Sequence, residues 1–123
     1  MMMRPYIVDH VVYPNGESGK ETVPEKLLEI CSPEEAARLT DMMTEVVSNG
    51  TGTAAAVGGV TVAGKTGTAE NATGNDHSWF IGFAPAENPK VAVAVMIENA
   101  NYGSATPIAG KIIQKALTEL GEY

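Results

Sequence analysis

The chain has 123 residues, which allows one domain with a modest hydrophobic core. Its apolar content of 44% and charged content of 19% are typical of a folded globular protein and argue against disorder. The formal net charge is −7, and no run of Lys or Arg occurs, so a nucleic acid is a poor partner.

Targeting signals and disulfides are not evident in these residues. No apolar stretch reaches the length of a transmembrane helix, and residues 1–5 do not have the pattern of a signal peptide. If the protein is exported, we expect its signal to lie outside these residues. Cys31 is alone and cannot form an internal disulfide, so cysteine usage does not decide the compartment.

The first thirty residues predict one short strand. Residues 5–13 are rich in apolar and β-branched side chains, and the Pro14-Asn15-Gly16 turn follows them. Residues 17–30 are polar and contain Pro24, which predicts an extended connection without a defined element.

A helix begins clearly after residue 32. Ser32 is a suitable N-cap, Pro33 suits the first helical position, and Glu35 can close a capping box. Asn49-Gly50 supplies the stop. The apolar positions recur every three or four residues and predict one buried stripe, which consists of Ala36, Leu39, Met43, Val46 and Val47. For the Met42-Met43 pair, core packing is favoured over an adaptable binding surface.

Three strands are predicted in the second half of the chain. Residues 51–59 predict a flexible loop, and residues 60–68 a strand. Residues 78–84 alternate apolar side chains on two faces, and Trp79 is expected in the core. Residues 91–97 form a continuous apolar run, which predicts a strand in the middle of a sheet covered on both sides.

The C-terminal segment and the lengths of the connections together predict the fold class. An amphipathic helix should begin at Thr106-Pro107 and end at Gly121. The short connections between the strands predict antiparallel neighbours. We therefore expect a single α+β domain over residues 1–123, with an antiparallel three- to four-stranded sheet, the C-terminal helix packed on it and one further helix.

The tetrad Lys65-Thr66-Gly67-Thr68 fits two motifs. Together with the residues from Gly59 it satisfies the G-x-x-x-x-G-K-[ST] pattern of a phosphate-binding loop. From Lys65 onward it is the K-T-G triplet of serine acyl-transferases. A phosphate loop needs a flexible turn followed by a helix, whereas residues 60–63 suit a strand and residues 67–75 are poor in helix formers. The triplet is therefore favoured.

Longer motifs extend this resemblance to a family. The chain resembles the C-terminal part of a penicillin-binding protein transpeptidase domain, of the β-lactamase-like superfamily. The likeness spans residues 5–120, and the monofunctional class B enzymes are the nearest in kind. It rests on Gly50-Thr51-Gly52-Thr53-Ala54, Gly64-Lys65-Thr66-Gly67-Thr68-Ala69-Glu70, Trp79-Phe80-Ile81-Gly82-Phe83-Ala84-Pro85 and Pro89-Lys90-Val91-Ala92-Val93-Ala94-Val95. Residues 102–107 depart from the family, which has a glycine pair and two alanines before the proline.

The resemblance implies a role for each member of the tetrad. Lys65 would supply positive charge near the serine nucleophile and the substrate carboxylate. The hydroxyls of Thr66 and Thr68 would bind that carboxylate, and the Thr68 backbone N–H would be an oxyanion-hole donor. Gly67 would leave room for a substrate that lies along the strand edge.

The other catalytic motifs of the family are absent from these residues. No serine has a lysine three positions later, and none has an asparagine two positions later. The chain therefore resembles a truncated domain without the S-x-x-K and S-x-N half, and the isolated chain should be inactive.

The resemblance also implies partners. In the complete domain these are peptidoglycan stem peptides and β-lactams, at the extracytoplasmic face of the bacterial membrane, with any anchor outside these residues. The fragment alone is expected to form a homo-oligomer through exposed apolar sheet surface. No cofactor or metal is predicted, and His10 and His77 are expected at the surface. A non-catalytic module that binds peptidoglycan peptides or another protein remains the alternative.

Overall fold

The computed structural model describes residues 1–72, 74–100 and 104–123. Its contacts divide the chain into two compact units, Met1–Ala36 and Ala37–Tyr123, and each is described by itself. Tyr102 and Gly103, on which the departure of residues 102–107 from the family pattern partly rests, lie outside the described residues.

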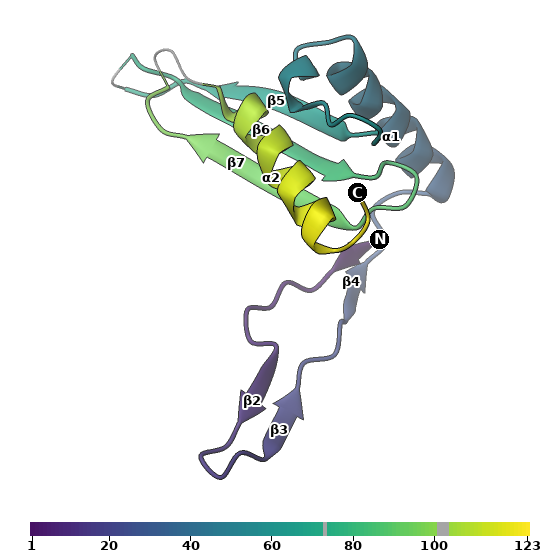
Figure 1. The fold of residues 1–123 in the computed structure, drawn as a ribbon, viewed down its shortest axis with the longest axis vertical. Helices are drawn as coiled ribbons and strands as arrows, with labels where there is room; N and C mark the ends of the chain where they lie inside the picture. Colours follow the sequence, from purple (N-terminus) through teal and green to yellow (C-terminus); the bar gives the residue numbers. More distant parts are fainter. Residues whose placement is uncertain (73, 101–103) are drawn as a thin grey trace. The chain divides into compact units, whose positions relative to one another are not determined.

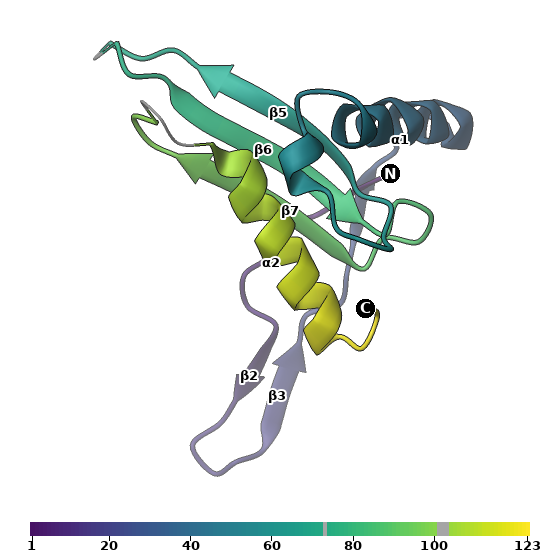
Figure 2. The ribbon, with the colours of Figure 1, turned by 45° about the horizontal axis from the view of Figure 1, so that its top comes forward.

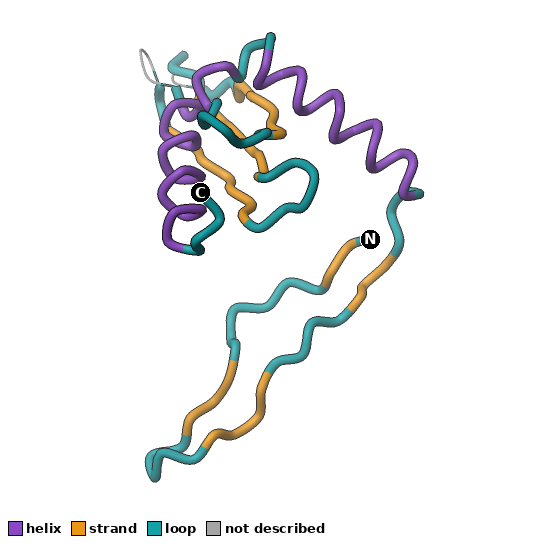
Figure 3. The backbone as a smooth tube through the Cα atoms, turned by 45° about the vertical axis from the view of Figure 1, so that its right-hand side comes forward, coloured by secondary structure: helices purple, strands orange, loops and turns teal. Residues whose placement is uncertain are grey.

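The first unit is an extended ribbon of short antiparallel strands (Figure 3). Strand β1 (Met2–Met3) pairs with β4 (Lys26–Leu28), and β2 (His10–Val12) pairs with β3 (Ser18–Glu21). The extended connection predicted for residues 17–30 is therefore wrong, because that segment contains β3 and β4.

The reason for this error is burial. The strands of the ribbon bury almost no side chains, so no alternation of apolar and polar residues marks them. The predicted strand at residues 5–13 forms only at β2. The predicted turn is confirmed: Gly16 has a φ of 85°, and its N–H donates to the Tyr13 carbonyl at 2.9 Å.

Helix α1 (Pro33–Ser48) begins with the predicted capping box. The Ser32 N–H donates to the Glu35 carboxylate at 2.8 Å, and the Glu35 N–H donates to the Ser32 hydroxyl at 3.2 Å. Its apolar stripe is buried only toward its end, at Val47. Leu39 and Met42 are exposed, so the core role predicted for the methionine pair is wrong for Met42.

The second unit contains one antiparallel sheet with the strand order β5-β6-β7 (Figure 1). Its strands are β5 (Ala63–Ala69), β6 (His77–Ala84) and β7 (Val91–Ile97). The α+β class is confirmed. The central position predicted for residues 91–97 is wrong, because among the described strands β7 lies at the edge of the sheet, and its side chains alternate between half-buried and exposed.

Helix α2 (Ala105–Glu119) lies along one face of this sheet (Figures 1 and 2). Ser104 caps it by accepting a hydrogen bond from the Thr106 N–H at 3.3 Å. Ala109, Ile113 and Leu117, spaced by one helical turn, are fully buried against the strands. The predicted C-terminal helix and its packing on the sheet are confirmed.

The loop before the sheet is partly packed against the rest of this unit. It contains a short 3₁₀ turn, η1 (Thr53–Ala55), and Ala55 is fully buried beside α2. A side chain at Gly110 of α2 would meet the Ala55 Cα at 3.0 Å, so a glycine is required for this close approach. Small residues, which suggested flexibility in the sequence, serve close packing here.

The two faces of the sheet have different environments. On the closed face, Phe80 is fully buried under α2. The opposite face, termed the open face, presents apolar side chains that no described element of this unit buries. It consists of Trp79, Ile81, Ala92, Ala94 and Met96. Trp79 is 38% exposed, so its predicted core position is wrong, and the neighbouring Phe80 occupies the core instead.

The position of the Phe80 ring predicts that substitution of Gly64 destabilises the fold. A Cβ at Gly64 would lie 2.3 Å from the Phe80 ring, whereas one at Gly67 would meet only the Trp79 Cβ at 3.3 Å. Gly64→Ala should reduce the free energy of unfolding by about 1–3 kcal/mol. Gly67→Ala, the matched control, should change it by less than about 1 kcal/mol. Urea denaturation measures both, and equal effects would contradict this account of the core.

The exposure of Trp79 gives a second prediction. Trp79 is the only tryptophan of the chain, so its fluorescence reports on the open face alone. At low protein concentration, acrylamide should quench the emission of the folded chain efficiently, with the urea-unfolded chain as the reference. A blue-shifted emission that resists acrylamide would show instead that Trp79 is buried.

Candidate functional site

The tetrad Lys65-Thr66-Gly67-Thr68 lies within β5. Its members pair in register with β6, from Lys65 opposite Ile81 to Thr68 opposite Ser78. β5 is at the edge of the sheet, so one side of it has no strand partner among the described residues. A phosphate-binding loop requires these residues to form a turn and the first turn of a helix, so the strand geometry contradicts that alternative.

Strand alternation divides the tetrad between the two faces. Thr66 and Thr68 share the closed face with their partners Phe80 and Ser78. Lys65 lies on the open face, like its partner Ile81. The structure therefore places the two threonines on one face of the strand and the lysine side chain on the opposite face.

The Lys65 side chain bends back to the backbone of the tetrad. Its ammonium donates a hydrogen bond to the Thr66 carbonyl oxygen at 2.7 Å. An ammonium group has three donors, so this bond leaves capacity for a further acceptor. Lys65 is exposed, and its charge is therefore available to an anionic group at the strand edge.

Thr51 adjoins the tetrad, although the sequence analysis gave it no role. Its hydroxyl lies 2.7 Å from the hydroxyl of Thr66, and either can be the donor. If Thr51 donates, the proton of Thr66 is free for an acceptor outside the protein. The only signal for Thr51 was its place in the Gly50-Thr51-Gly52 stretch, which suggested family membership without a role.

Gly67 lies on the open face opposite Trp79. A Cβ at this position would meet the Trp79 Cβ at 3.3 Å, a tight contact that a shift of a few tenths of an ångström would relieve. The absence of a side chain leaves the tetrad backbone accessible, as a substrate lying along the strand edge would require. That role stays a prediction.

An apolar groove adjoins Lys65. It has a volume of about 410 Å³, and five of its six lining residues are apolar. They come from α1, β5 and β6, and the lining is Leu39, Met42, Met43, Val46, Lys65 and Ile81. Lys65 is thus the one charged group beside an apolar surface.

A smaller, polar cavity of about 210 Å³ lies at the other end of the tetrad. Thr68, His77 and Ser78 are among its lining residues. His77 was predicted as a surface residue, but it is half-buried and its ring is hydrogen-bonded to the backbone of Asn99, which corrects that prediction. His10 is exposed as predicted and pairs with Asp9 at 2.9 Å.

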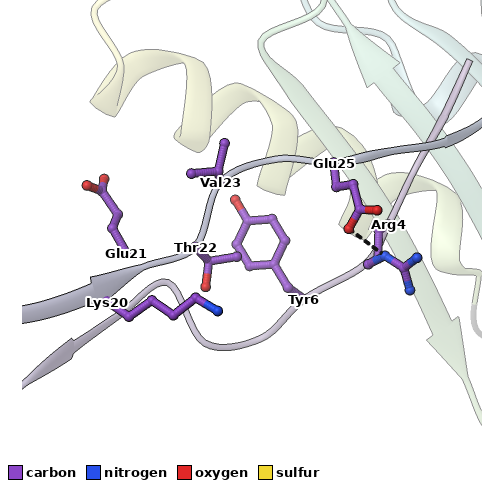
Figure 4. A pocket seen from close by; sticks show the side chains of 7 residues that line it. All are labelled: Arg4, Tyr6, Lys20, Glu21, Thr22, Val23 and Glu25. Atoms are coloured by element: carbon purple, nitrogen blue, oxygen red, sulfur yellow. Dashed lines mark hydrogen bonds and ion pairs between the residues drawn. The ribbon is translucent and has the colours of Figure 1, made fainter.

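The first unit has an open cavity of its own, of about 320 Å³ (Figure 4). Arg4 and Glu25 form an ion pair at its border, with the Arg4 Nε 2.8 Å from the carboxylate. Both side chains are more than half exposed, so the pair contributes little to stability.

Other charged groups lie away from the tetrad. Hydrogen bonding by the Thr61 side chain and by the backbone of Glu87 lowers the pKa of the Glu87 carboxyl. In the described part of the chain, no three His, Cys, Asp or Glu side chains gather where they could hold a metal ion. None of the described helices is both long enough and apolar enough to cross a membrane.

Comparison with known proteins identifies the family. Residues 1–117 match the model of the penicillin binding protein transpeptidase domain. The chain is 42% identical over 130 aligned residues to the peptidoglycan D,D-transpeptidase PbpA of Mycolicibacterium smegmatis, and the match covers 95% of this chain and 26% of that protein.

Solved structures have the same fold. The D,D-transpeptidase domain of a peptidoglycan glycosyltransferase from Eggerthella lenta superposes with a TM-score of 0.91 at 46% identity, covering 98% of this chain and 29% of that one. Penicillin-binding protein A from M. tuberculosis, in its imipenem acyl-enzyme complex, gives a TM-score of 0.75 at 39% identity, covering 95% of this chain and 26% of that one.

These matches agree with the family that the sequence motifs suggested. The chain spans about a quarter of the length of the relatives that it matches. Its 123 residues belong to the penicillin-binding protein transpeptidase domain family.

Proposed function

We propose that these residues form the carboxylate-binding side of the active site of a peptidoglycan D,D-transpeptidase. The observation that carries the proposal is the tetrad on an edge strand, with the Lys65 ammonium at the Thr66 carbonyl and a hydroxyl pair on the other face. The acyl-enzyme complexes of the M. tuberculosis relative support acyl transfer as the chemistry.

In this reaction, a serine oxygen attacks the carbonyl carbon of the penultimate D-alanine of a stem peptide, and the terminal D-alanine leaves. An amine of a neighbouring stem then takes the acyl group and regenerates the serine. Lys65 attracts the carboxylate of the leaving residue, and the hydroxyls of Thr66 and Thr68 donate hydrogen bonds to it. The Thr68 backbone N–H stabilises the negative charge that develops on the carbonyl oxygen.

Thr51 adds to this arrangement by fixing the Thr66 hydroxyl at 2.7 Å. A hydroxyl that is already oriented loses less freedom when it binds the carboxylate, which favours preorganised recognition. The proposal therefore includes Thr51 as a residue that orients Thr66.

The nucleophile must come from a segment outside residues 1–123, because no serine here has a lysine three positions later. The remaining groups are electrostatic and cannot form an acyl-enzyme on their own. Peptidoglycan stem peptides and β-lactams are the proposed ligands of the complete domain, which would act at the extracytoplasmic face of the membrane.

Acylation by a fluorescent penicillin tests this function. In the transpeptidase domain that carries residues 1–123, Lys65→Gln should slow acylation by about 10²-fold, because it removes a positive charge that attracts the β-lactam carboxylate. Lys90→Gln is the control, since Lys90 pairs with Glu122 at 3.6 Å and lies outside the tetrad. Equal rates for Lys65→Gln and Lys90→Gln would overturn the assignment.

The 123-residue chain alone should remain unlabelled in the same assay. Labelling of the chain alone would show that it contains its own nucleophile. If the transpeptidase domain were also unlabelled, while stem peptides still bound reversibly, the non-catalytic binding module would be the better description.

We also propose that the isolated chain self-associates through its open face. Exposed apolar surface of this kind drives association in water. Ile81→Lys should reduce the sedimentation coefficient of the chain toward that of a monomer. Ile112→Lys is the matched control, because Ile112 has a similar exposure, 44% against 50%, but lies on α2. A monodisperse monomer before any substitution would contradict the proposal.

A further inference from the structure

Three polar side chains meet at the end of the sheet where β5 stops. His77 begins β6, Asn71 follows β5, and Asn99 follows β7. The Asn99 backbone N–H donates to the His77 Nδ1 at 3.0 Å. The Asn71 amide nitrogen donates to the Asn99 Oδ1 at 3.0 Å and lies 3.3 Å from the His77 Nε2. These contacts join the ends of three strands.

The hydrogen bond from Asn99 determines the state of the imidazole. A backbone N–H can only donate, so Nδ1 must offer a lone pair and carries no proton. In the neutral ring the proton is then on Nε2. The Asn71 amide nitrogen donates its two protons to the Asn75 carbonyl at 2.6 Å and to the Asn99 Oδ1 at 3.0 Å, so it is a close neighbour of Nε2 and not its hydrogen-bond partner. His77 therefore acts as an acceptor through one defined atom, and a residue without an acceptor at that position cannot replace it.

Asn99 has an unusual backbone conformation that this bond helps to hold. Its φ is 50°, in the left-handed region that non-glycine residues adopt infrequently. The following residue is also tied to the start of β6, because the Ala100 N–H donates to the Asp76 carbonyl at 2.8 Å. The exit of β7 is thus fixed to the entry of β6 by two adjacent hydrogen bonds.

This cluster adjoins the tetrad. His77 is the register partner of Ala69, and the next pair along the strands is Ser78 with Thr68. His77, Ser78 and Thr68 line the same polar cavity of about 210 Å³. Ser78 in turn accepts a hydrogen bond from the Ala105 N–H at 3.0 Å, which ties the start of α2 to the strand that faces Thr68.

We propose that His77 is a positioning residue, which holds the Thr68 end of β5 in place by accepting the Asn99 N–H through Nδ1. The relevance of this position to acyl transfer rests on the function proposed above, in which Thr68 binds the carboxylate and supplies an oxyanion-hole donor. His77 itself touches neither the substrate nor the reacting atoms.

Two substitutions separate this role from simple packing. In His77→Asn, the Oδ1 can take the place of Nδ1 and accept the Asn99 N–H. In His77→Gln, the longer side chain carries its amide toward the position of Nε2 and leaves Asn99 without this acceptor. Both variants replace the ring by an uncharged amide, so they differ mainly in the position of the acceptor.

NMR of the 123-residue chain reads out the contact directly. Long-range nitrogen–proton correlation should show the His77 proton on Nε2. The Asn99 amide should exchange with solvent about tenfold faster in His77→Gln than in the unsubstituted chain or His77→Asn, as expected for the loss of one hydrogen bond. The Thr68 amide resonance should shift in His77→Gln and stay in place in His77→Asn.

This readout does not depend on catalysis. A proton on Nδ1, or a Thr68 resonance that moves equally in both variants or in neither, would overturn the positioning role. These outcomes stand even if the transpeptidase function proves wrong.

Acylation by penicillin gives the second readout, in the transpeptidase domain that carries these residues. His77→Gln should slow it by about tenfold, because a small displacement of a binding group lowers the rate steeply. His77→Asn should restore most of the rate. Equal losses in both variants would overturn the positioning role, whereas a Lys65→Gln variant with the rate of the unsubstituted domain would overturn the proposed function itself.

Discussion

Phe80 and the two glycines around it set the orientation of the whole sheet. The ring is fully buried, and it occupies space that a side chain at Gly64 or Gly82 would require. Because side chains alternate along a strand, burying Phe80 under α2 forces Trp79 and Ile81 to the other face. The same constraint crosses to β5, where Thr66 lies opposite Phe80 and Lys65 opposite Ile81.

The chemistry of the tetrad follows from this alternation. Side chains on opposite faces of a strand can contact the same ligand only along the edge of the sheet, where no neighbouring strand separates them. Lys65 meets this condition, since its ammonium lies 2.7 Å from the Thr66 carbonyl. The threonine hydroxyls are beside the same backbone on the closed face. Along this edge, the positive charge of Lys65 on the open face and the hydroxyls of Thr66 and Thr68 on the closed face border the same stretch of backbone. Neither face of β5 alone carries all three groups.

The sequence predicted the parts of the fold that have strong local signals. The capping box at Ser32, the turn before Gly16, the amphipathic α2 and the strand that carries the tetrad were all confirmed. These features depend on neighbouring residues, so a short pattern determines them. The fold class followed from the short connections between the strands.

The faces of the sheet were harder to predict. Residues 78–84 are apolar on both faces, so alternation alone does not say whether Trp79 or Phe80 is covered. Gly64 and Gly82 indicate in retrospect which face is covered, because both leave room for the Phe80 ring. Residues 91–97 are likewise apolar at every position, which led to the prediction of a central strand covered on both faces. In the structure the alanines of β7 are exposed. Thr51 and His77 contact residues that are distant in the sequence, and no local pattern marks such contacts.

An edge strand also explains why residues outside the tetrad matter for its geometry. In the described part of the chain, β5 pairs with a strand on one side only, so its position depends on β6 and on the segments at its two ends. Near its start, the strand packs over Phe80. At its far end, beyond Thr68, His77 and Ser78 of the partner strand accept hydrogen bonds from the Asn99 N–H and from the Ala105 N–H at the start of α2. Polar contacts therefore surround this end of the strand, and hydrogen bonds are directional whereas apolar packing is not.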